Sequence, residues 1–119
     1  MTRINVGIPP AELVNQHLLA EHREIKRIPN CIAKGRYNMD GIPDQFKLGK
    51  GHVKFFYNKL LHLKKRYIRL YEECIKRGFN VQNYIEAWSD LPEELMNDYN
   101  VKANDIRIIR ERINEKLNK

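Results

Sequence analysis

The sequence predicts an all-α protein, a compact three-helix bundle with long irregular connections and almost no strand. Apolar residues recur at three- and four-residue steps in three segments of the chain, and this spacing places them on one face of a helix. The stretches between these segments contain glycine and proline and lack the alternating pattern of a strand. Helices that each carry one apolar face bury those faces against one another, so a single bundle is expected.

The first predicted helix begins at Pro9 and Pro10, because the first helical N–H groups have no partner within the helix and proline lacks one. Pro29 is expected to end or bend this helix near Ile28. Five apolar residues are expected to form its core face: Val14, Leu18, Ile25, Ile28 and Ile32. Among the polar residues, Gln16, Arg23 and Arg27 fall opposite that face, while His17 and Glu24 fall on its border.

The middle of the chain predicts a loop followed by a long helix. Residues 33–51 contain glycines, a proline and basic side chains, which is typical of a connecting loop. Residues 52–77 carry apolar side chains at helical spacing, and Gly78 is expected to close this helix as its C-cap. The aromatic residues of this segment are mostly expected in the core, with Phe55 off the main seam.

The last third predicts an irregular stretch and a final helix. Residues 79–101 are expected to be irregular, with one short helical turn near residues 89–94. The final helix is expected from about Asn104, acting as the N-cap, to Leu117. Its inward side is expected to carry Ile106, Ile109, Ile113 and Leu117.

Composition narrows the function. A chain of 119 residues is expected to form one domain, residues 1–119. The 22 Lys and Arg against 15 Asp and Glu leave a formal charge of +7, which favours a polyanionic partner, most often nucleic acid, although many small basic proteins are merely soluble. Cys31 and Cys74 stand outside any Cys/His cluster, so reduced thiols are expected, with no metal and no cofactor.

The second residue suggests a reactive N-terminus. A small residue, Thr2, follows Met1, and removal of the methionine would leave Thr2 with a free α-amine. The pKa of such an amine is about 7.7–8.0, against about 10.4 for lysine, so part of it is a neutral nucleophile near neutral pH. It can attack a carbon at the carbonyl oxidation level, such as C1′ of a deoxyribose, and form a Schiff base. Glu24 is the candidate carboxylate for stabilising the developing cation or shuttling protons.

Several residues have plainer interpretations. Many proteins begin with Met-Thr, and His17 alone is more often a structural histidine. Glu21 falls near the centre of the core face and is expected to be a buried partner of Arg3 or of the N-terminus. Arg23 and Arg27 also fit a solvated helix face.

Taken together, sequence blocks spread over nearly the whole chain carry a family resemblance. They are Met1-Thr2-Arg3-Ile4-Asn5, Gln16-His17-Leu18, Ala20-Glu21, Arg23-Glu24, Gly51-His52-Val53, Phe55-Phe56-Tyr57, Lys59-Leu60, Cys74, Lys76-Arg77-Gly78-Phe79-Asn80 and Glu115-Lys116. With these blocks the chain resembles the phage pyrimidine-dimer DNA glycosylases of the endonuclease V type, which are N-glycosylases and abasic-site lyases.

The resemblance implies roles for individual residues. Thr2 would attack C1′ of the damaged nucleotide, Glu24 would stabilise the cationic sugar and the imine, and β-elimination would then cut the strand. The partner would be double-stranded damaged DNA, kinked, with the base opposite the lesion turned out. The remaining site residues would bind DNA: Arg3, Arg23 and Arg27 near the lesion, Gln16 and His17 in the pocket, and Arg112 and Lys116 on the last helix.

Two departures from the family concern recognition of the lesion. The aromatic and basic tail of the phage enzymes has no counterpart before Lys119, and the 33–51 loop is shorter and less basic. A glycosylase of the same mechanism acting on an oxidised, alkylated or modified base therefore stays open, as does a non-enzymatic DNA-binding helical domain. The chain shows no export signal, and no stretch approaches the roughly 20 apolar residues of a membrane span. A soluble monomer is expected, in the cytoplasm of a bacterial cell or a phage-infected host.

Overall fold

The protein is described by a computed structural model that covers residues 2–118 in detail, and all regular structure in that range is helical. The expected all-α class is thus confirmed. The α-helices are α1 (Asn15–Glu24), α2 (Arg27–Ala33), α3 (His52–Phe55), α4 (Leu60–Lys76) and α5 (Ala103–Leu117). Three short 3₁₀ helices also occur: η1 (Pro10–Glu12), η2 (Ile85–Trp88) and η3 (Glu93–Leu95).

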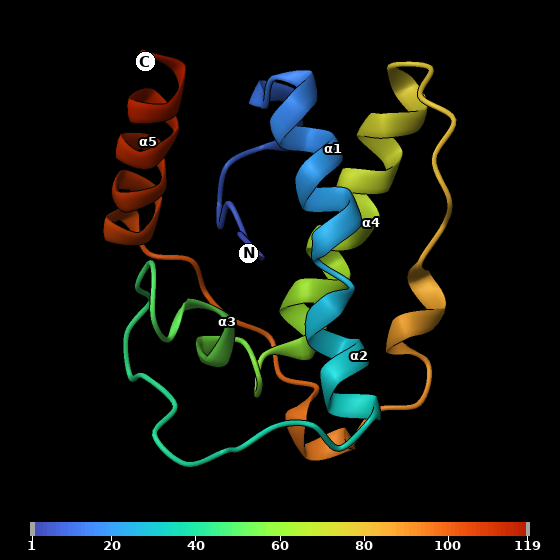
Figure 1. Ribbon diagram of the computed structural model, residues 1–119, viewed down its shortest axis with the longest axis vertical. Helices are drawn as coiled ribbons and strands as arrows, with labels where there is room; N and C mark the ends of the chain where they lie inside the picture. Colours follow the sequence, from blue (N-terminus) through green and yellow to red (C-terminus); the bar gives the residue numbers. More distant parts are fainter. Residues whose placement is uncertain (1, 119) are drawn as a thin grey trace.

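The arrangement is broadly that of a three-helix bundle. Helix α1 packs along α4 and α2, which follows α1, packs against η2, while α5 stands on the other side of the N-terminal segment (Figure 1). Gly7, at φ +76°, lets that segment pass close to the start of α5, because a Cβ there would lie 2.7 Å from a side-chain carbon of Ile106. The N-terminal residues are therefore enclosed between two helices.

The first helix begins later and breaks earlier than the sequence predicts. Pro10 starts the 3₁₀ helix η1, and α1 begins only at Asn15. The break comes at Ile25 and Lys26, before Pro29, which lies inside α2. Proline at position 29 has no N–H to offer the carbonyl of Ile25, and its ring would crowd that carbonyl. The carbonyl of Ile25 accepts instead from the Ile28 N–H at 3.4 Å, so the helix breaks before the proline is reached.

The predicted helix over residues 52–77 is two helices. It ends as α3 at Phe55 and resumes as α4 at Leu60. Both Phe55 and Phe56 are fully buried, 1% and 0% exposed, so the prediction that Phe55 lies off the core seam is wrong. A straight helix would direct these neighbours about 100° apart, and the turn between α3 and α4 allows both to enter the core.

The helix ends are partly as predicted. Gly78 closes α4 at φ +84°, where the Phe79 N–H donates to the Cys74 carbonyl at 3.0 Å, as expected of a glycine C-cap. Helix α5 begins at Ala103, so Asn104 is not its N-cap; the Asp105 carboxylate accepts the Lys102 N–H at 3.0 Å instead. The irregular stretch over residues 79–101 contains η2 and η3 rather than one turn.

A cluster of buried apolar side chains joins all five α-helices. Three apolar residues of the predicted helical faces are exposed instead: Val14 in the first helix at 40%, Ile75 in the 52–77 segment at 49% and Leu117 in the last helix at 53%. Each lies at a helix end, where no other described element covers it.

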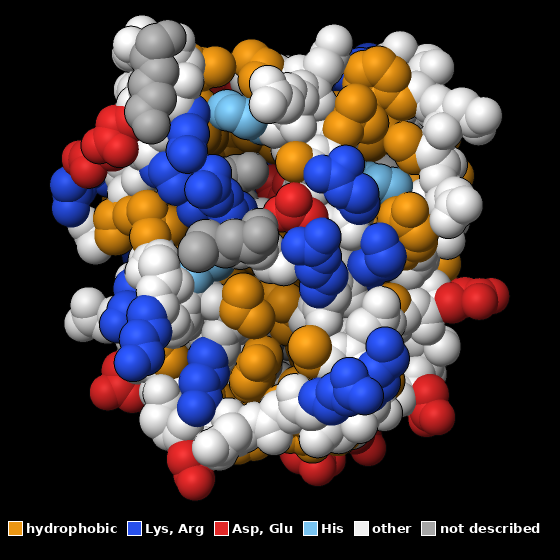
Figure 2. All heavy atoms as spheres, in the orientation of Figure 1, with side chains coloured by type: hydrophobic (Ala, Val, Ile, Leu, Met, Phe, Trp, Pro, Cys, Tyr) orange, Lys and Arg blue, Asp and Glu red, His pale blue; other side chains and the backbone are white. Residues whose placement is uncertain are grey.

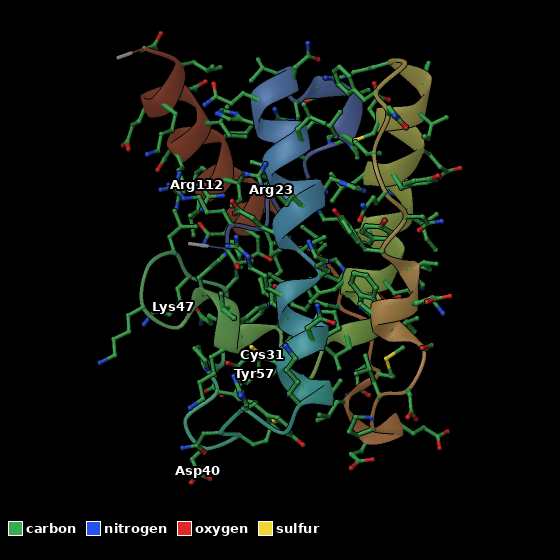
Figure 3. All side chains as sticks on the ribbon, turned by 45° about the vertical axis from the view of Figure 1, so that its right-hand side comes forward. Arg23, Cys31, Asp40, Lys47, Tyr57 and Arg112 are labelled. Atoms are coloured by element: carbon green, nitrogen blue, oxygen red, sulfur yellow. The ribbon has the colours of Figure 1, made fainter. Side chains whose placement is uncertain are left out.

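Both cysteines are free thiols: Cys74 is buried, which raises its pKa, and Cys31 lies beside Tyr57 (Figure 3). Within residues 2–118, no helix has the length and apolar character needed to cross a membrane.

Candidate active site

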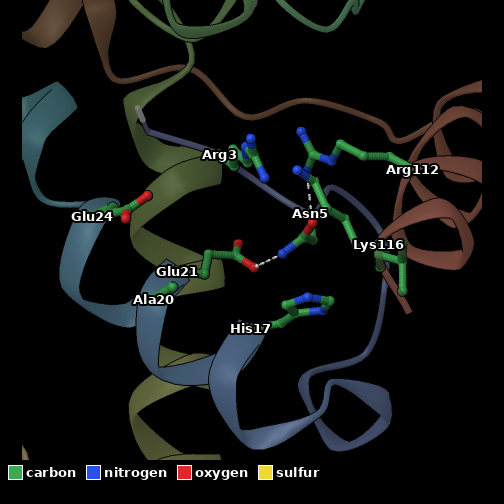
Figure 4. A pocket seen from close by; sticks show the side chains of 9 residues that line it. Arg3, Asn5, His17, Ala20, Glu21, Glu24, Arg112 and Lys116 are labelled. Atoms are coloured by element: carbon green, nitrogen blue, oxygen red, sulfur yellow. Dashed lines mark hydrogen bonds between the residues drawn. The ribbon is translucent and has the colours of Figure 1, made fainter. Parts of the chain in front are cut away.

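A cavity of about 260 Å³ opens where the N-terminal segment, α1 and α5 meet (Figure 4). Helix α1 forms one wall, α5 the opposite wall, and residues 3–5 lie between them. Its lining comprises Arg3, Asn5, His17, Ala20, Glu21, Glu24, Arg112, Ile113 and Lys116. The cavity thus combines carboxylates, cations and one imidazole.

The wall from α1 follows from helical spacing. Positions 17, 20, 21 and 24 are three and four residues apart and share one face of the helix. Glu24 is the last residue of α1, and its side chain is 15% exposed. A guanidinium nitrogen of Arg23 lies 3.6 Å from the Glu24 carboxylate, with the Arg23 side chain 59% exposed. Glu24 is therefore a mostly buried carboxylate that faces the cavity and carries one loose cationic contact.

A buried polar network supports the cavity floor. Asn5 accepts a hydrogen bond from Arg112 at 2.7 Å and donates one to Glu21 at 2.7 Å. Glu21 in turn accepts from Arg66 on α4, and Arg66 donates to the carbonyl of Ile8 at 3.0 Å. This network joins α5, the N-terminal segment, α1 and α4.

The electrostatics of the cavity favour anions. Arg3, Arg112 and Lys116 bring three cations, whereas Glu21 is neutralised by Arg66 below the floor. Burial, Arg112, Arg3 and Lys116 lower the pKa of His17, so its imidazole is neutral at neutral pH. Burial and the neighbouring Arg3 also lower the pKa of Arg112. Such a group of cations suits the phosphates of a nucleic acid.

Basic side chains also gather outside the cavity. On the face shown in Figure 2, lysine and arginine side chains surround the region of α1 and α5, and acidic side chains lie mostly at the edges. In Figure 3, Arg23 from α1 and Arg112 from α5 lie on the same part of the molecule, with Lys47 of the α2–α3 loop below them. The face around the cavity is therefore basic beyond the cavity itself.

The N-terminal segment is anchored from the inside. Thr2 is 8% exposed, although Arg3 beside it is exposed. The backbone N–H of Ile4 donates to Nε2 of His52 at 2.9 Å, and Nδ1 of His52 lies 2.9 Å from the carbonyl oxygen of Lys47. The start of the described chain is thus tied to the loop before α3.

The residues predicted for the site separate into two groups. Five of them line the cavity: Arg3, His17, Glu24, Arg112 and Lys116. Gln16, Arg23 and Arg27 are exposed and lie outside the lining. Thr2 is buried at the head of the N-terminal segment and is likewise not part of the lining. The predicted removal of Met1 concerns a residue outside the described range.

One of the two partners predicted for Glu21 is wrong, and some lining residues are missed by sequence reasoning. Glu21 is buried as expected, yet its partners among the described residues are Arg66 and Asn5 rather than Arg3, and the alternative partner, the N-terminus, lies outside the described residues. Asn5 and Ile113 line the cavity without any assigned role in the prediction. The position of Ala20 at the cavity could have been predicted from the sequence, because a small residue one turn from Glu24 leaves room on the cavity wall. Asn5 lies in an irregular segment, where periodicity says nothing about orientation.

Metal binding finds no support in the described part of the chain, where no group of three or more His, Cys, Asp or Glu side chains is arranged to hold an ion. The charged groups of the cavity are instead basic side chains and carboxylates.

Residues 1–87 match the model of a protein family described as pyrimidine dimer DNA glycosylase. The matched range covers the N-terminal segment and α1 to α4, while Arg112 and Lys116 lie beyond it on α5.

Proposed function

The chain belongs to the pyrimidine dimer DNA glycosylase family, and from this premise we propose that it is a bifunctional enzyme that releases a damaged base and then cuts the abasic site. The nucleophile is the α-amine of Thr2 after loss of Met1. Glu24 assists at the sugar. The substrate is double-stranded DNA that carries a pyrimidine dimer, and the protein acts as a monomer.

The observation that carries this proposal is the meeting of three features at one cavity. Glu24 is a mostly buried carboxylate on its wall, Arg3, Arg112 and Lys116 bring cations to the same cavity, and the N-terminal segment runs between its two walls. A pocket for base excision needs a group that stabilises positive charge on the sugar and groups that hold the flanking phosphates. The cavity supplies both kinds of group.

The glycosylase step begins with the neutral amine. An α-amine with a pKa near 8 is partly unprotonated at neutral pH. Its nitrogen bonds to C1′, the bond between C1′ and the base nitrogen breaks, and the base nitrogen keeps the electron pair and takes up the proton that the amine loses. The C1′–O4′ bond then breaks, the ring oxygen takes up a proton, and an imine forms between Thr2 and C1′. The negative Glu24 stabilises the positive charge that develops on the sugar and on the imine.

The lyase step follows from the imine. The protonated imine withdraws electrons from C2′, so a C2′ proton is lost to a base. The electron pair then moves to form a double bond between C2′ and C3′, and the C3′–O bond breaks with the 3′ phosphate as leaving group. Water hydrolyses the remaining imine and frees the amine. Glu24 and the neutral imidazole of His17 are the candidate proton carriers of the cavity.

DNA is held by the basic residues of the cavity and its surroundings. Arg3, Arg112 and Lys116 bind phosphates next to the lesion from inside the cavity. Gln16, Arg23 and Arg27 are exposed outside it and contact the flanking backbone. A kinked duplex with a turned-out base brings the sugar within reach of Thr2.

Borohydride trapping tests the proposal directly, because the reductant converts an imine into a stable covalent bond. The mature protein, with Thr2 verified as its first residue by intact mass, is incubated with duplexes that carry either one thymine dimer or one abasic site. A covalent adduct with both duplexes is expected. An adduct with the abasic duplex alone retains the lyase and redirects the search to an oxidised, alkylated or modified base.

Absence of an adduct with either duplex would overturn the enzymatic proposal in favour of a DNA-binding domain without catalysis. Retention of Met1 would lead to the same result for a different reason, since it blocks the amine, and the mass measurement separates the two cases. DNA affinity alone does not discriminate between them, because both readings require a basic surface.

A further inference from the structure

His52 connects the N-terminal segment to the α2–α3 loop, and this connection belongs neither to the packing between helices nor to the cavity lining. It is the first residue of α3, it is 4% exposed, and its ring contacts Phe46 and Phe56 edge-on with centroids 5.4 and 5.5 Å apart. Its two nitrogens face two different backbone groups, the Ile4 N–H and the Lys47 carbonyl, each at 2.9 Å. The imidazole is therefore a bridge between the N-terminal segment and the α2–α3 loop.

The two partners determine the protonation state of the ring. A carbonyl oxygen only accepts, so Nδ1 carries the hydrogen that it donates to Lys47. A backbone N–H only donates, so Nε2 must present a lone pair to Ile4. Both bonds exist together only in the neutral ring with its hydrogen on Nδ1.

We propose that His52 is a positioning residue that fixes the backbone at Ile4 and thereby holds the α-amine of Thr2 in place at the cavity. This inference rests on the proposed use of that amine as the nucleophile. Within the described residues, the bond to His52 is the hydrogen bond that holds the backbone of residues 2–4. Only two residues, Thr2 and Arg3, separate this fixed point from the amine, so its displacement moves the nucleophile.

The size of the effect follows from the geometry that the attack needs. The amine nitrogen has to approach C1′ along a narrow direction at about 3–3.5 Å, and a displacement of about 1 Å costs on the order of 100-fold in rate. The exposed side chain of Arg3 adds no rigid support of its own. His52 is buried and packed between aromatic rings, so it provides the rigid point.

Acid should release the anchor. Burial lowers the pKa of His52, and the Lys47 carbonyl raises it again in part. The charged groups facing the ring are Arg112 on α5 and Arg3 on the N-terminal segment, which disfavour protonation, and Glu21 on α1, which favours it. Once protonated, Nε2 carries a hydrogen that opposes the Ile4 N–H, and the bond at Ile4 is lost while the bond at Lys47 persists.

Two isosteric variants separate the two bonds. The amide nitrogen of asparagine occupies roughly the place of Nδ1, so His52→Asn keeps the donor to Lys47 and loses the acceptor for Ile4. The longer side chain in His52→Gln carries an amide oxygen to roughly the place of Nε2, so it restores the acceptor for Ile4. The measurements are the single-turnover rate of borohydride trapping on an abasic duplex at saturating DNA, the Kd for the same duplex, and hydrogen exchange at the Ile4 amide.

We expect His52→Asn to slow trapping by about 10- to 100-fold with Kd changed less than about threefold, and to lose exchange protection at Ile4. His52→Gln should stay within about threefold of the parent protein in all three measurements. The ratio of the parent rate to that of His52→Gln should fall as the pH is lowered through the His52 transition, because the glutamine does not titrate.

Equal slowing in both variants, or an unchanged trapping rate in His52→Asn, would overturn the inference. So would a parent protein whose Ile4 amide exchanges without protection. A parent protein that is not trapped although it starts at Thr2 refutes the proposed function instead, and exchange at Ile4 then still decides whether His52 anchors the segment.

Discussion

The carboxylate of Glu21 on α1 accepts two hydrogen bonds from the guanidinium of Arg66 on α4, and the two side chains are only 1% and 7% exposed. Arg66 also donates to the Ile8 carbonyl at 3.0 Å, and Glu21 also accepts from Asn5. A buried ion pair of this kind sets the relative position of the elements that it joins. Here it fixes α1, which carries Glu24, against α4 and the N-terminal segment.

Loss of one partner should destabilise the fold strongly. Arg66→Met leaves the buried Glu21 carboxylate without its cation, and such changes cost about 3–5 kcal/mol in the free energy of unfolding. Arg66→Met with Glu21→Leu should recover most of this loss, because no buried charge remains. Urea unfolding measures both. Arg107→Met is the control, since its ion pair with Glu111 is more than half exposed, and exposed pairs contribute about 1 kcal/mol or less.

Asn5 should act on DNA binding through Arg112. It holds the Arg112 guanidinium at 2.7 Å, so Asn5→Ala should weaken DNA binding less than Arg112→Ala does. The double variant should be little worse than Arg112→Ala alone, with a coupling of about 0.5–3 kcal/mol between the two sites. Kd values for one duplex measure this cycle. Asn114→Ala, an exposed position on α5, is the control. Effects that simply add would show that Asn5 does not act through Arg112.

Helical periodicity predicts which segments are helices here, but it does not predict where they end. The break before Pro29 depends on the carbonyl of Ile25, four residues upstream, and not on the proline's own position in the apolar pattern. The turn between α3 and α4 depends on the burial of both Phe55 and Phe56. The local chemistry of proline decided the first boundary and tertiary packing the second, and the apolar pattern of a segment contains neither kind of information.

The sequence predicts part of the site, because helical spacing shows which side chains share a face of one helix but not which helices meet. Positions 17 and 24 lie on the border of the core face of one helix, so their presence at the cavity follows from helical spacing. Asn5 and Arg66 lie on other elements, and their roles arise only when α1, α4 and α5 are brought together. The amine of Thr2 was proposed from chemistry alone, and its reactivity remains a prediction.

Glu24→Gln should abolish base release and leave DNA binding nearly unchanged. The amide keeps the size of the side chain and removes the negative charge that stabilises the sugar cation, so the single-turnover rate should fall by at least about 100-fold. Cleavage of the glycosidic bond in a dimer-containing duplex, detected as an alkali-sensitive strand break, measures this rate. Glu86→Gln removes a carboxylate from an exposed position in η2 and should have no effect. A Glu24 variant that releases the base at the normal rate would refute the assigned role.

Arg23 and Arg27 should contribute to binding through phosphates. Both are exposed outside the cavity, so Arg23→Ala and Arg27→Ala should each weaken DNA binding and reduce the slope of log affinity against log salt by about 1. Titrations at several salt concentrations measure the slope. Arg69→Ala is the matched control, because Arg69 is an exposed arginine that lines other grooves. A slope that is unchanged in both test variants would place these arginines outside the DNA contact.

Mild acid should weaken the fold through its histidines. Burial lowers the pKa of all four histidines, His17, His22, His52 and His62, below the usual 6.5. The unfolded chain then binds more protons than the folded chain, so stability rises with pH in this window. Their contribution is fully present above about pH 6.5, the unfolded value, and is lost as the pH falls toward the lower pKa values of the folded state.

The free energy of unfolding in urea should therefore be smaller at pH 5.5 than at pH 8 at equal ionic strength. Asp98, whose pKa is lowered chiefly by the hydrogen bond from Lys65, contributes only at more acidic pH and does not affect this comparison. His62→Gln should remove the share of the difference that His62 contributes. The substitution breaks no hydrogen bond at Nε2, because this atom has no partner among the described residues. Equal stability at the two pH values would show that the four imidazoles titrate alike in the folded and unfolded chains.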